Sequence, residues 1–182
     1  MANSRILIVY YSRSGTTRQL VQALSADLQC DIEEIVETKS RSGVLGYLRS
    51  VIEARRQRPS ITVARAIKDP SLYDLIILGT PVWAWSVSSP VRAYMMANRT
   101  RFAAVAFFCT CGGSGSDSAF AQMQQLAGKA PRGRLFFTAR QVVKHRLEPR
   151  LTEFLKMLAS PEAGMTSPPQ AKAAKTSATA VS

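Results

Sequence analysis

The sequence has little histidine and cysteine, with one histidine and three cysteines among 182 residues. A single histidine and an odd cysteine count disfavour a structural zinc site and a disulfide-stapled secreted domain. They also leave few residues for Ser-His-Asp or Cys-His catalysis. We expect His145, which lies in a charged run, to be a solvated surface residue, and Cys109 and Cys111 to pack as small apolar side chains.

Long hydrophobic runs are also missing. No apolar run approaches the ~20 residues that span a bilayer. The run Ile6–Tyr11 is too short for a signal-peptide core, and no small-residue cleavage site follows it. We therefore expect a soluble cytoplasmic protein. Residues 1–160 suffice for one domain, and residues 161–182, rich in Ala, Ser, Thr, Pro and Lys, are expected to form a disordered tail.

Acidic residues are scarce: 12 Asp and Glu face 24 Lys and Arg, giving a formal charge of +12 and a pI near 10.3. The basic residues cluster in residues 41–58 and 129–150. Neither cluster is interleaved with the aromatic residues on which a single-strand binder stacks bases, so nucleic acid is an unlikely partner. Solvated faces are the first interpretation, and a docking surface for an acidic redox partner is the second.

Strand and helix patterns alternate along the chain, as in parallel α/β sheets. We expect either a doubly wound, five-stranded parallel sheet of order 2-1-3-4-5 or half of a dinucleotide-binding fold. Ligands bind such sheets beyond the carboxyl ends of the strands. The expected strands are Arg5–Tyr11, Asp31–Val36, Asp74–Thr80, Phe102–Cys109 and Leu135–Ala139; the expected helices are Gly15–Leu28, 44–56, one starting at Ser89–Pro90 with Ser89 as N-cap, 116–127 and 147–158, while 61–67 fits a small strand or a loop.

The first of three unusual loops follows the first expected strand. It has four hydroxyls and a glycine in six residues, and it precedes a helix N-terminus, whose free N–H groups attract phosphate. It lacks both the Gly-x-x-x-x-Gly-Lys and the Gly-x-Gly-x-x-Gly patterns, which favours a terminal phosphate monoester. Helix capping by Ser14 or Thr16 is the alternative. The loop residues are Ser12, Arg13, Ser14, Gly15, Thr16 and Thr17.

The second loop, Gly79–Ser86, contains both tryptophans of the chain, and we expect at least one of them to contact a flat ligand. Folding of both into the core is the alternative. The third loop, 110–117, has three glycines in four positions, which permits close approach of the backbone to a ligand. Cys109 and Cys111, separated by one residue, do not form Cys-x-x-Cys, and the loop is not that of small tyrosine phosphatases because no arginine stands at the required position.

With these loops in this order, the chain resembles the flavodoxin family, over Ile6–Thr17, Tyr73–Tyr94 and Phe107–Phe120 and, in strand pattern, over about residues 4–159. The resemblance implies a flavodoxin-like fold of order 2-1-3-4-5 with FMN bound. Its phosphate would lie on residues 12–17. The residues implied for the ring are Pro81, Val82, Trp83, Ala84 and Trp85 from the second loop and Thr110, Cys111, Gly112 and Gly113 from the third, with Asp117 a weaker candidate.

The resemblance leaves three functions open. The first is an FMN-dependent oxidoreductase that takes electrons from NAD(P)H or a reductase and reduces a quinone, a flavin or a protein. The second is a non-catalytic electron carrier for an acidic partner, since flavodoxin carriers are acidic and this chain is basic. The third is a flavin-free binding module. No side-chain acid or base stands out as catalytic.

Overall fold

The computed structural model describes residues 4–36 and 67–159. The expected helix at 44–56, residues 61–66, the basic cluster at 41–58 and the tail at 161–182 lie outside these described residues. None of the described helices is long and apolar enough to cross a membrane.

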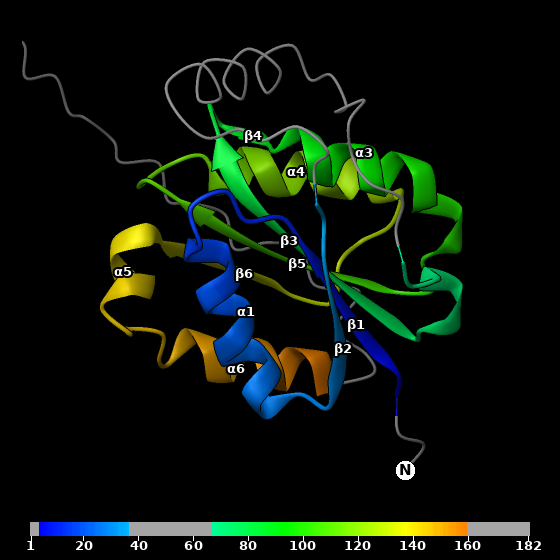
Figure 1. The fold of residues 1–182 in the computed structure, drawn as a ribbon, viewed down its shortest axis with the longest axis horizontal. Coiled ribbons are helices and arrows are strands. Elements are labelled where there is room, and N and C mark those ends of the chain that lie inside the picture. Colours follow the sequence, from blue (N-terminus) through cyan, green and yellow to red (C-terminus); the bar gives the residue numbers. More distant parts are fainter. Residues whose placement is uncertain (1–3, 37–66, 160–182) are drawn as a thin grey trace, which may run out of the picture.

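The expected sheet is confirmed (Figure 1). Five parallel strands stand in the order β2-β1-β3-β5-β6, which is 2-1-3-4-5 when these five are counted along the chain. A short sixth strand, β4, pairs antiparallel with β3. The strands are β1 (Ile6–Tyr10), β2 (Cys30–Glu34), β3 (Leu75–Trp83), β4 (Ser86–Val87), β5 (Val105–Cys111) and β6 (Arg134–Thr138).

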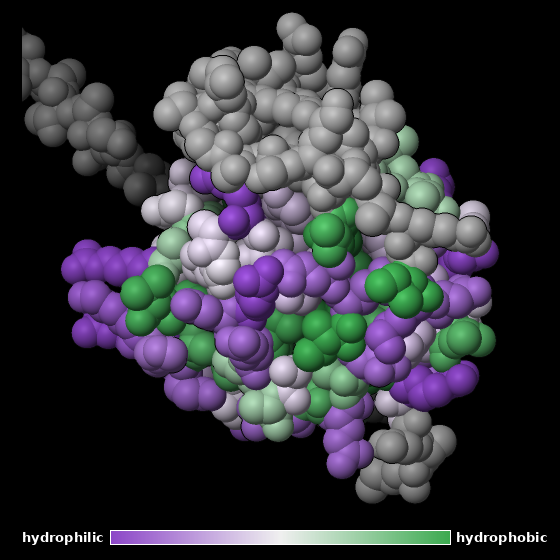
Figure 2. All heavy atoms as spheres, viewed as in Figure 1, coloured by the Kyte–Doolittle hydropathy of each residue, from purple (hydrophilic) through white to green (hydrophobic). Residues whose placement is uncertain are grey.

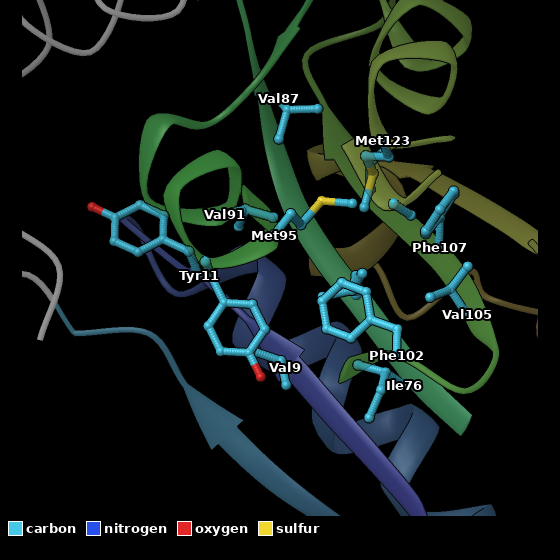
Figure 3. Packing of buried hydrophobic residues seen from close by; sticks show 14 of the residues in the cluster. Val9, Tyr11, Ile76, Val87, Val91, Met95, Phe102, Val105, Phe107 and Met123 are labelled. Carbon is cyan, nitrogen blue, oxygen red and sulfur yellow. The ribbon is translucent and has the colours of Figure 1, made fainter. Parts of the chain in front are cut away.

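Helices cover both faces of the sheet, because its central strands carry apolar side chains on both sides. Over one face, α3 and α4 enclose the cluster shown in Figure 3, which includes Phe107, Met95 and Met123. Over the other face, α1 and α6 pack on a second cluster that includes Phe108, Leu24 and Phe154. The helices are α1 (Thr16–Asp27), α3 (Ser89–Asn98), α4 (Ser116–Ala127), α5 (Ala139–Val143) and α6 (Arg150–Ala159), with short 3₁₀ turns η1 (Pro70–Leu72) and η2 (Arg99–Arg101).

The starts of α3 and α6 differ from the expectation, and one short helix was not expected. The N-cap of α3 is Ser88 rather than Ser89, because the Ser88 carbonyl accepts the N–H of Arg92 at 3.0 Å. Helix α6 begins at Arg150 rather than at residue 147, since a residue that precedes proline is disfavoured in the helical region and Pro149 follows Glu148. Helix α5 was not expected, although Thr138 and Gln141, three residues apart, match the capping-box pattern and form that capping box in the structure.

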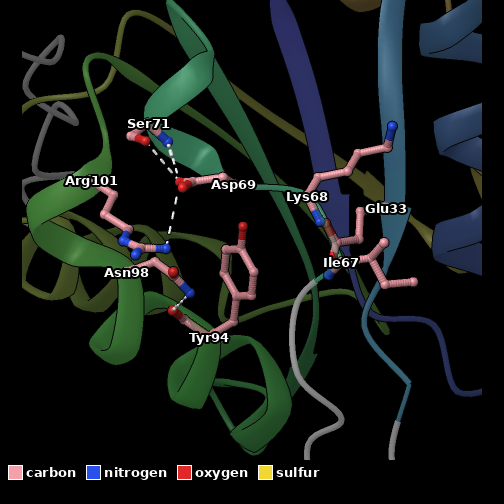
Figure 4. A network of polar contacts seen from close by, with 8 residues as sticks. All are labelled: Glu33, Ile67, Lys68, Asp69, Ser71, Tyr94, Asn98 and Arg101. Carbon is pink, nitrogen blue, oxygen red and sulfur yellow. Dashed lines mark hydrogen bonds and ion pairs between the residues drawn. The ribbon is translucent and has the colours of Figure 1, made fainter.

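A dense polar network anchors the segment Ile67–Asp74, which leads into β3 and is called the entry segment below (Figure 4). The backbone N–H groups of Ile67 and Lys68 donate to the Glu33 carboxylate at 2.9 and 3.0 Å. Asp69 accepts from the backbone and hydroxyl of Ser71 and pairs with Arg101 at 3.5 Å. Each of these carboxylates therefore has its partners within the protein.

The entry segment is also tied to β2 and β1. Asp31 on β2 accepts a hydrogen bond from the Tyr73 hydroxyl at 2.6 Å and pairs with Lys68 at 3.2 Å. Asp74 accepts the N–H of Arg5 at 2.8 Å. These contacts hold the amino end of β3 in register with its neighbours.

Candidate functional site

Three segments leave the carboxyl ends of β1, β3 and β5, which are adjacent in the sheet. They therefore lie side by side at one edge of the molecule (Figure 1). They are the first loop (Ser12–Thr17), the hairpin tip (Ala84–Trp85) between β3 and β4, and the glycine loop (Gly112–Gly115) between β5 and α4.

The first loop presents the N-terminus of α1 without a side-chain cap. Its N-cap, Gly15, has φ 88°, and a Cβ added there would meet nothing within 4 Å. The capping hypothesis for Ser14 and Thr16 is therefore wrong: their hydroxyl oxygens lie 3.5 Å from each other, and it is Ser12 Oγ that accepts the N–H of Arg18, at 3.3 Å. The loop thus combines hydroxyls, a helix N-terminus and open space above a glycine, which suits an anion.

The expected second loop is mostly strand. β3 continues through Trp83, because Val82 pairs with Val87 and Trp83 with Ser86 in a hairpin. Only Ala84 and Trp85 form the turn, with φ 47° and 61°. A two-residue turn with positive φ at both positions is the type I′ turn, which normally takes Asn or Gly. Two L-residues in the left-handed region cost about 1–2 kcal/mol each, so the surrounding contacts must hold them there.

The two tryptophans play different parts. Trp83 is half-buried, and its ring meets Tyr11 edge to face at a centroid distance of 5.6 Å. Trp85, at the hairpin tip, is 64% exposed. An exposed indole beside two loops offers a flat apolar surface, whereas Trp83 joins the hairpin to the end of β1.

The expected third loop is also shorter than predicted. Thr110 and Cys111 are the last residues of β5 and are buried, so Gly112 is the first loop residue. Cβ atoms added at Gly112 and Gly113 would meet nothing within 4 Å. Burial raises the pKa of the Cys109 thiol well above its ordinary value, which keeps it protonated and agrees with its apolar packing.

The strands that carry the three segments are joined close to their carboxyl ends, and two of the segments touch each other. Thr17 Oγ1 at the first loop lies 2.9 Å from Thr110 Oγ1 at the end of β5. The N–H of Tyr11, just before the first loop, donates to the Gly79 carbonyl of β3 at 3.2 Å. Gly115, the N-cap of α4 with φ 93°, lies so close to the hairpin that a Cβ on it would stand 3.0 Å from Trp85 Cα. These contacts therefore hold the three segments close together at the carboxyl edge of the sheet.

The hairpin is held from behind by residues that the sequence reading did not single out. Thr80 Oγ1 accepts the N–H of Ser88 at 3.1 Å, which joins the two arms of the hairpin. Gln122 on α4 donates to the Trp85 carbonyl at 3.2 Å. A glutamine on the buried side of an amphipathic helix was the available signal, but its partner lies 37 residues away along the chain.

Several basic residues of the described chain already have partners within the protein. Arg18 on α1 is paired with Glu34 at 2.7 Å, and this bond raises the pKa of its guanidinium. Within the basic cluster 129–150, Lys129 donates to the Phe102 and Ala103 carbonyls, and Arg134 donates to Gln124 at 2.5 Å. Asp117, in the first turn of α4, is exposed.

Three other cations of that cluster follow the carboxyl end of β6. Helix α5 follows the carboxyl end of β6 and packs beside α1. It carries Arg140, and the turn after it carries Lys144 and Arg146, both exposed. Figure 2 shows hydrophilic side chains projecting where Figure 1 places α5. His145, in the same turn, is exposed as expected.

The arrangement suits a flat ligand with an anionic tail. The first loop offers hydroxyls and helix N–H groups for the anion, while the exposed indole of the hairpin tip and the open positions at Gly112 and Gly113 offer surfaces for a planar group. The sequence-predicted residues Ser12–Thr17, Pro81–Trp85 and Thr110–Gly113 are thus brought to one edge, with Thr17, Thr110 and Cys111 buried beneath it.

Comparisons with known proteins point the same way. A family model described as flavodoxin matches residues 5–147. The structure is similar to that of a flavoprotein from Lactobacillus acidophilus solved in complex with FMN, with 21% identity, a TM-score of 0.63 and coverage of 78% of this chain and 97% of that one. A flavoprotein from Bacteroides eggerthii gives 18% identity, a TM-score of 0.62 and coverage of 79% and 96%. At such identities the likeness establishes the fold, and no curated protein matches the chain.

Proposed function

The chain belongs to the flavodoxin family, and from this premise we propose that it binds FMN at the carboxyl edge of its sheet and acts as an FMN-dependent oxidoreductase. Electrons would come from NAD(P)H or a reductase and pass to a quinone, a flavin or a protein acceptor. The similar Lactobacillus acidophilus structure, described as a complex with FMN, supports the choice of cofactor. The absence of a membrane-crossing helix among the described residues is compatible with the cytoplasmic location that we include in the proposal.

The observation that carries the proposal is the first loop. Gly15, in the left-handed conformation, has no side chain with which to cap the N-terminus of α1, and there is free space where its Cβ would stand. Ser12, Ser14 and Thr16 add hydroxyl donors around the same point. A phosphate monoester with nearly two charges takes several donors at once, and a helix N-terminus supplies both N–H groups and a partial positive charge.

We assign the flavin ring to the surface formed by the hairpin tip and the open end of the glycine loop at Gly112 and Gly113. The exposed indole of Trp85 provides a surface for stacking, and Gly112 and Gly113 let the backbone approach the ring edge. Bound FMN would supply the hydride and electron transfer, so the chain needs no acid or base of its own. Its residues bind, orient and set the charge around the ring.

A non-catalytic carrier for an acidic partner is the second candidate. The cations on α5 and in the turn after it favour this role, because they stand beside the first loop at the edge from which electrons would leave. Arg140, Lys144 and Arg146 would steer an acidic protein towards the flavin and make its association rate sensitive to salt.

Two measurements test these proposals. A purified protein with flavin absorbance, or an apoprotein that takes up added FMN, supports both roles, and a protein that refuses FMN rules out both. Oxidation of NADH or NADPH by the FMN-loaded protein alone supports the enzyme. Turnover that appears only with an added reductase, and slows steeply with salt, supports the carrier.

A further inference from the structure

Behind the hairpin tip lies a small polar cluster that the proposed function does not yet use. Its centre is the side chain of Gln122 on α4, which packs beside α3 and β4 (Figure 1). Gln122 Oε1 accepts from Ser86 Oγ at 2.7 Å and from Arg92 Nη2 at 2.5 Å. Gln122 Nε2 donates to the Trp85 carbonyl at 3.2 Å. One amide thus connects α3 to the strained turn.

Arg92 on α3 is an unusual member of this cluster. It is only 5% exposed, and its Nε has no hydrogen-bond partner. Its Nη2 donates to Gln122 and, at 3.2 Å, to Ser86 Oγ, and none of the described carboxylates pairs with it. Burial lowers the pKa of this guanidinium. A buried charge that no described carboxylate neutralises is costly, so this arginine stands in a place where folding alone would favour an apolar residue.

We propose that Arg92 is a positioning residue for the flavin-ring site: by fixing the orientation of Gln122, it holds the Ala84–Trp85 turn in its left-handed conformation before any ligand arrives. The identity of the ligand rests on the proposed function. The conformation of the turn does not, because the contacts that hold it belong to the free protein.

The direction of the hydrogen bonds gives the mechanism. A guanidinium has only donors, so the group that faces Arg92 must be the oxygen of the Gln122 amide. The NH₂ group then faces the opposite way, towards the Trp85 carbonyl. A flipped amide would set its oxygen against that carbonyl and leave the turn without a donor. Arg92 therefore acts on the turn through Gln122 and need not touch the ligand.

The test compares three variants with one control. Arg92→Met removes the donors and the charge, and Arg92→Lys restores a donor and the charge. Gln122→Glu keeps an acceptor for Arg92 but places a carboxylate oxygen against the Trp85 carbonyl. Arg99→Met removes an exposed cation at the far end of α3, away from the hairpin. For each we would measure the FMN dissociation constant, the melting temperature and the NMR signals of the two tryptophan indole N–H groups without FMN.

We expect Arg92→Met to weaken FMN binding by roughly fivefold to tenfold and to shift or broaden the Trp85 indole signal in the free protein, with Arg92→Lys intermediate. Gln122→Glu should bind FMN as weakly as Arg92→Met does. Its melting temperature should stay at or above that of the parent, since the buried cation then gains a charged partner. Arg99→Met should match the parent.

A stable Gln122→Glu protein with unchanged FMN affinity and an unchanged Trp85 signal would overturn the proposal, even if Arg92→Met failed to fold. A parent protein that does not bind FMN, but whose Trp85 signal still responds to Arg92→Lys and Gln122→Glu, would reject the proposed function and retain the positioning role. The two failures are therefore distinguishable.

Discussion

The two ends of β3 differ in how they satisfy their polar groups. The entry segment, which leads into β3, fills its own network: Asp69 accepts from Ser71 and pairs with Arg101, and Asp31 accepts from Tyr73. At the other end, α1 and α4 begin at left-handed glycines without side-chain caps. One end uses its donors to hold the strands, and the other leaves donors available to a ligand.

The difference also appears in backbone strain. Ala84 and Trp85 are two of the three non-glycine residues with positive φ among those that the structure describes. Such strain is kept at functional sites when surrounding contacts hold it. The strained turn and the glycines that start α1 and α4 lie at the same edge, at the carboxyl ends of the strands. This edge is the binding end of the sheet, and the edge that carries the entry segment is the anchored end.

The largest expected effect is a loss of stability in the sheet, to which both ends of β3 belong. A Cβ at Gly79 would lie 1.9 Å from Cζ of Phe108, its partner in the β3–β5 register. Gly79→Ala should therefore lower the free energy of unfolding by about 3 kcal/mol or more, at the upper end of overpacking penalties. Chemical denaturation measures this loss. Gly112→Ala, at a position with nothing within 4 Å, is the matched control and should be nearly neutral.

The next effect should appear at the binding end alone. Replacing Thr16 and Thr17 together by alanine should weaken FMN binding by ~1–3 kcal/mol, because Thr16 supplies a hydroxyl donor for the phosphate and the Thr17 hydroxyl ties the first loop to Thr110. Fluorescence titration of FMN measures the change. Ser71→Ala removes a hydroxyl of the same kind from the entry segment, where it bonds Asp69, and should leave FMN affinity as it was. Equal FMN affinity in both variants would place the phosphate elsewhere.

A smaller effect, on two glycines with positive φ, distinguishes a loss of stability from a loss of FMN affinity. Gly15 and Gly128 both have positive φ, 88° and 68°, and a Cβ fits at both. Alanine at either should cost about 1–2 kcal/mol of stability, since both lie in the left-handed region. Only Gly15→Ala should also reduce FMN affinity, because Gly15 starts α1 at the site whereas Gly128 ends α4. A matching loss of affinity in Gly128→Ala would show that general destabilisation is responsible.

The smallest effect is a pH-dependent change in melting temperature at Asp31, which bonds the entry segment. The hydrogen bond from Tyr73, followed by that from Lys68, lowers the pKa of Asp31 below its ordinary value. A depressed carboxyl pKa stabilises the fold above the unfolded pKa of about 3.9, and this contribution is lost as the pH falls through the folded value. Asp31→Asn should therefore melt slightly lower than the parent at pH 7, and the gap should close at about pH 2. A gap that persists in acid would contradict the assigned cause.

Much of the fold could be predicted from sequence because its signals are local. The apolar run at β1 and the glycine after α4 mark their elements directly, and the alternation of strands and helices gives the sheet order. The position of the first loop followed from the same pattern, since it joins the first strand to the first helix.

The hairpin could not be predicted in this way. Its β4 strand is two residues long, and the turn uses Ala84 and Trp85 where Asn or Gly would signal it. What holds the turn is Gln122, 37 residues further along the chain, together with a buried arginine on another helix. Contacts of this range depend on packing and leave no local pattern in the sequence.

Binding of the FMN phosphate at the first loop and the N-terminus of α1 is tested most directly by titrating the apoprotein with FMN and with riboflavin, which carries the same ring without the phosphate. If the first loop binds the phosphate, FMN should bind at least about a hundredfold more tightly, because two or more charge-assisted hydrogen bonds are lost with riboflavin. Equal affinity for the two ligands, or binding of neither, would contradict this assignment.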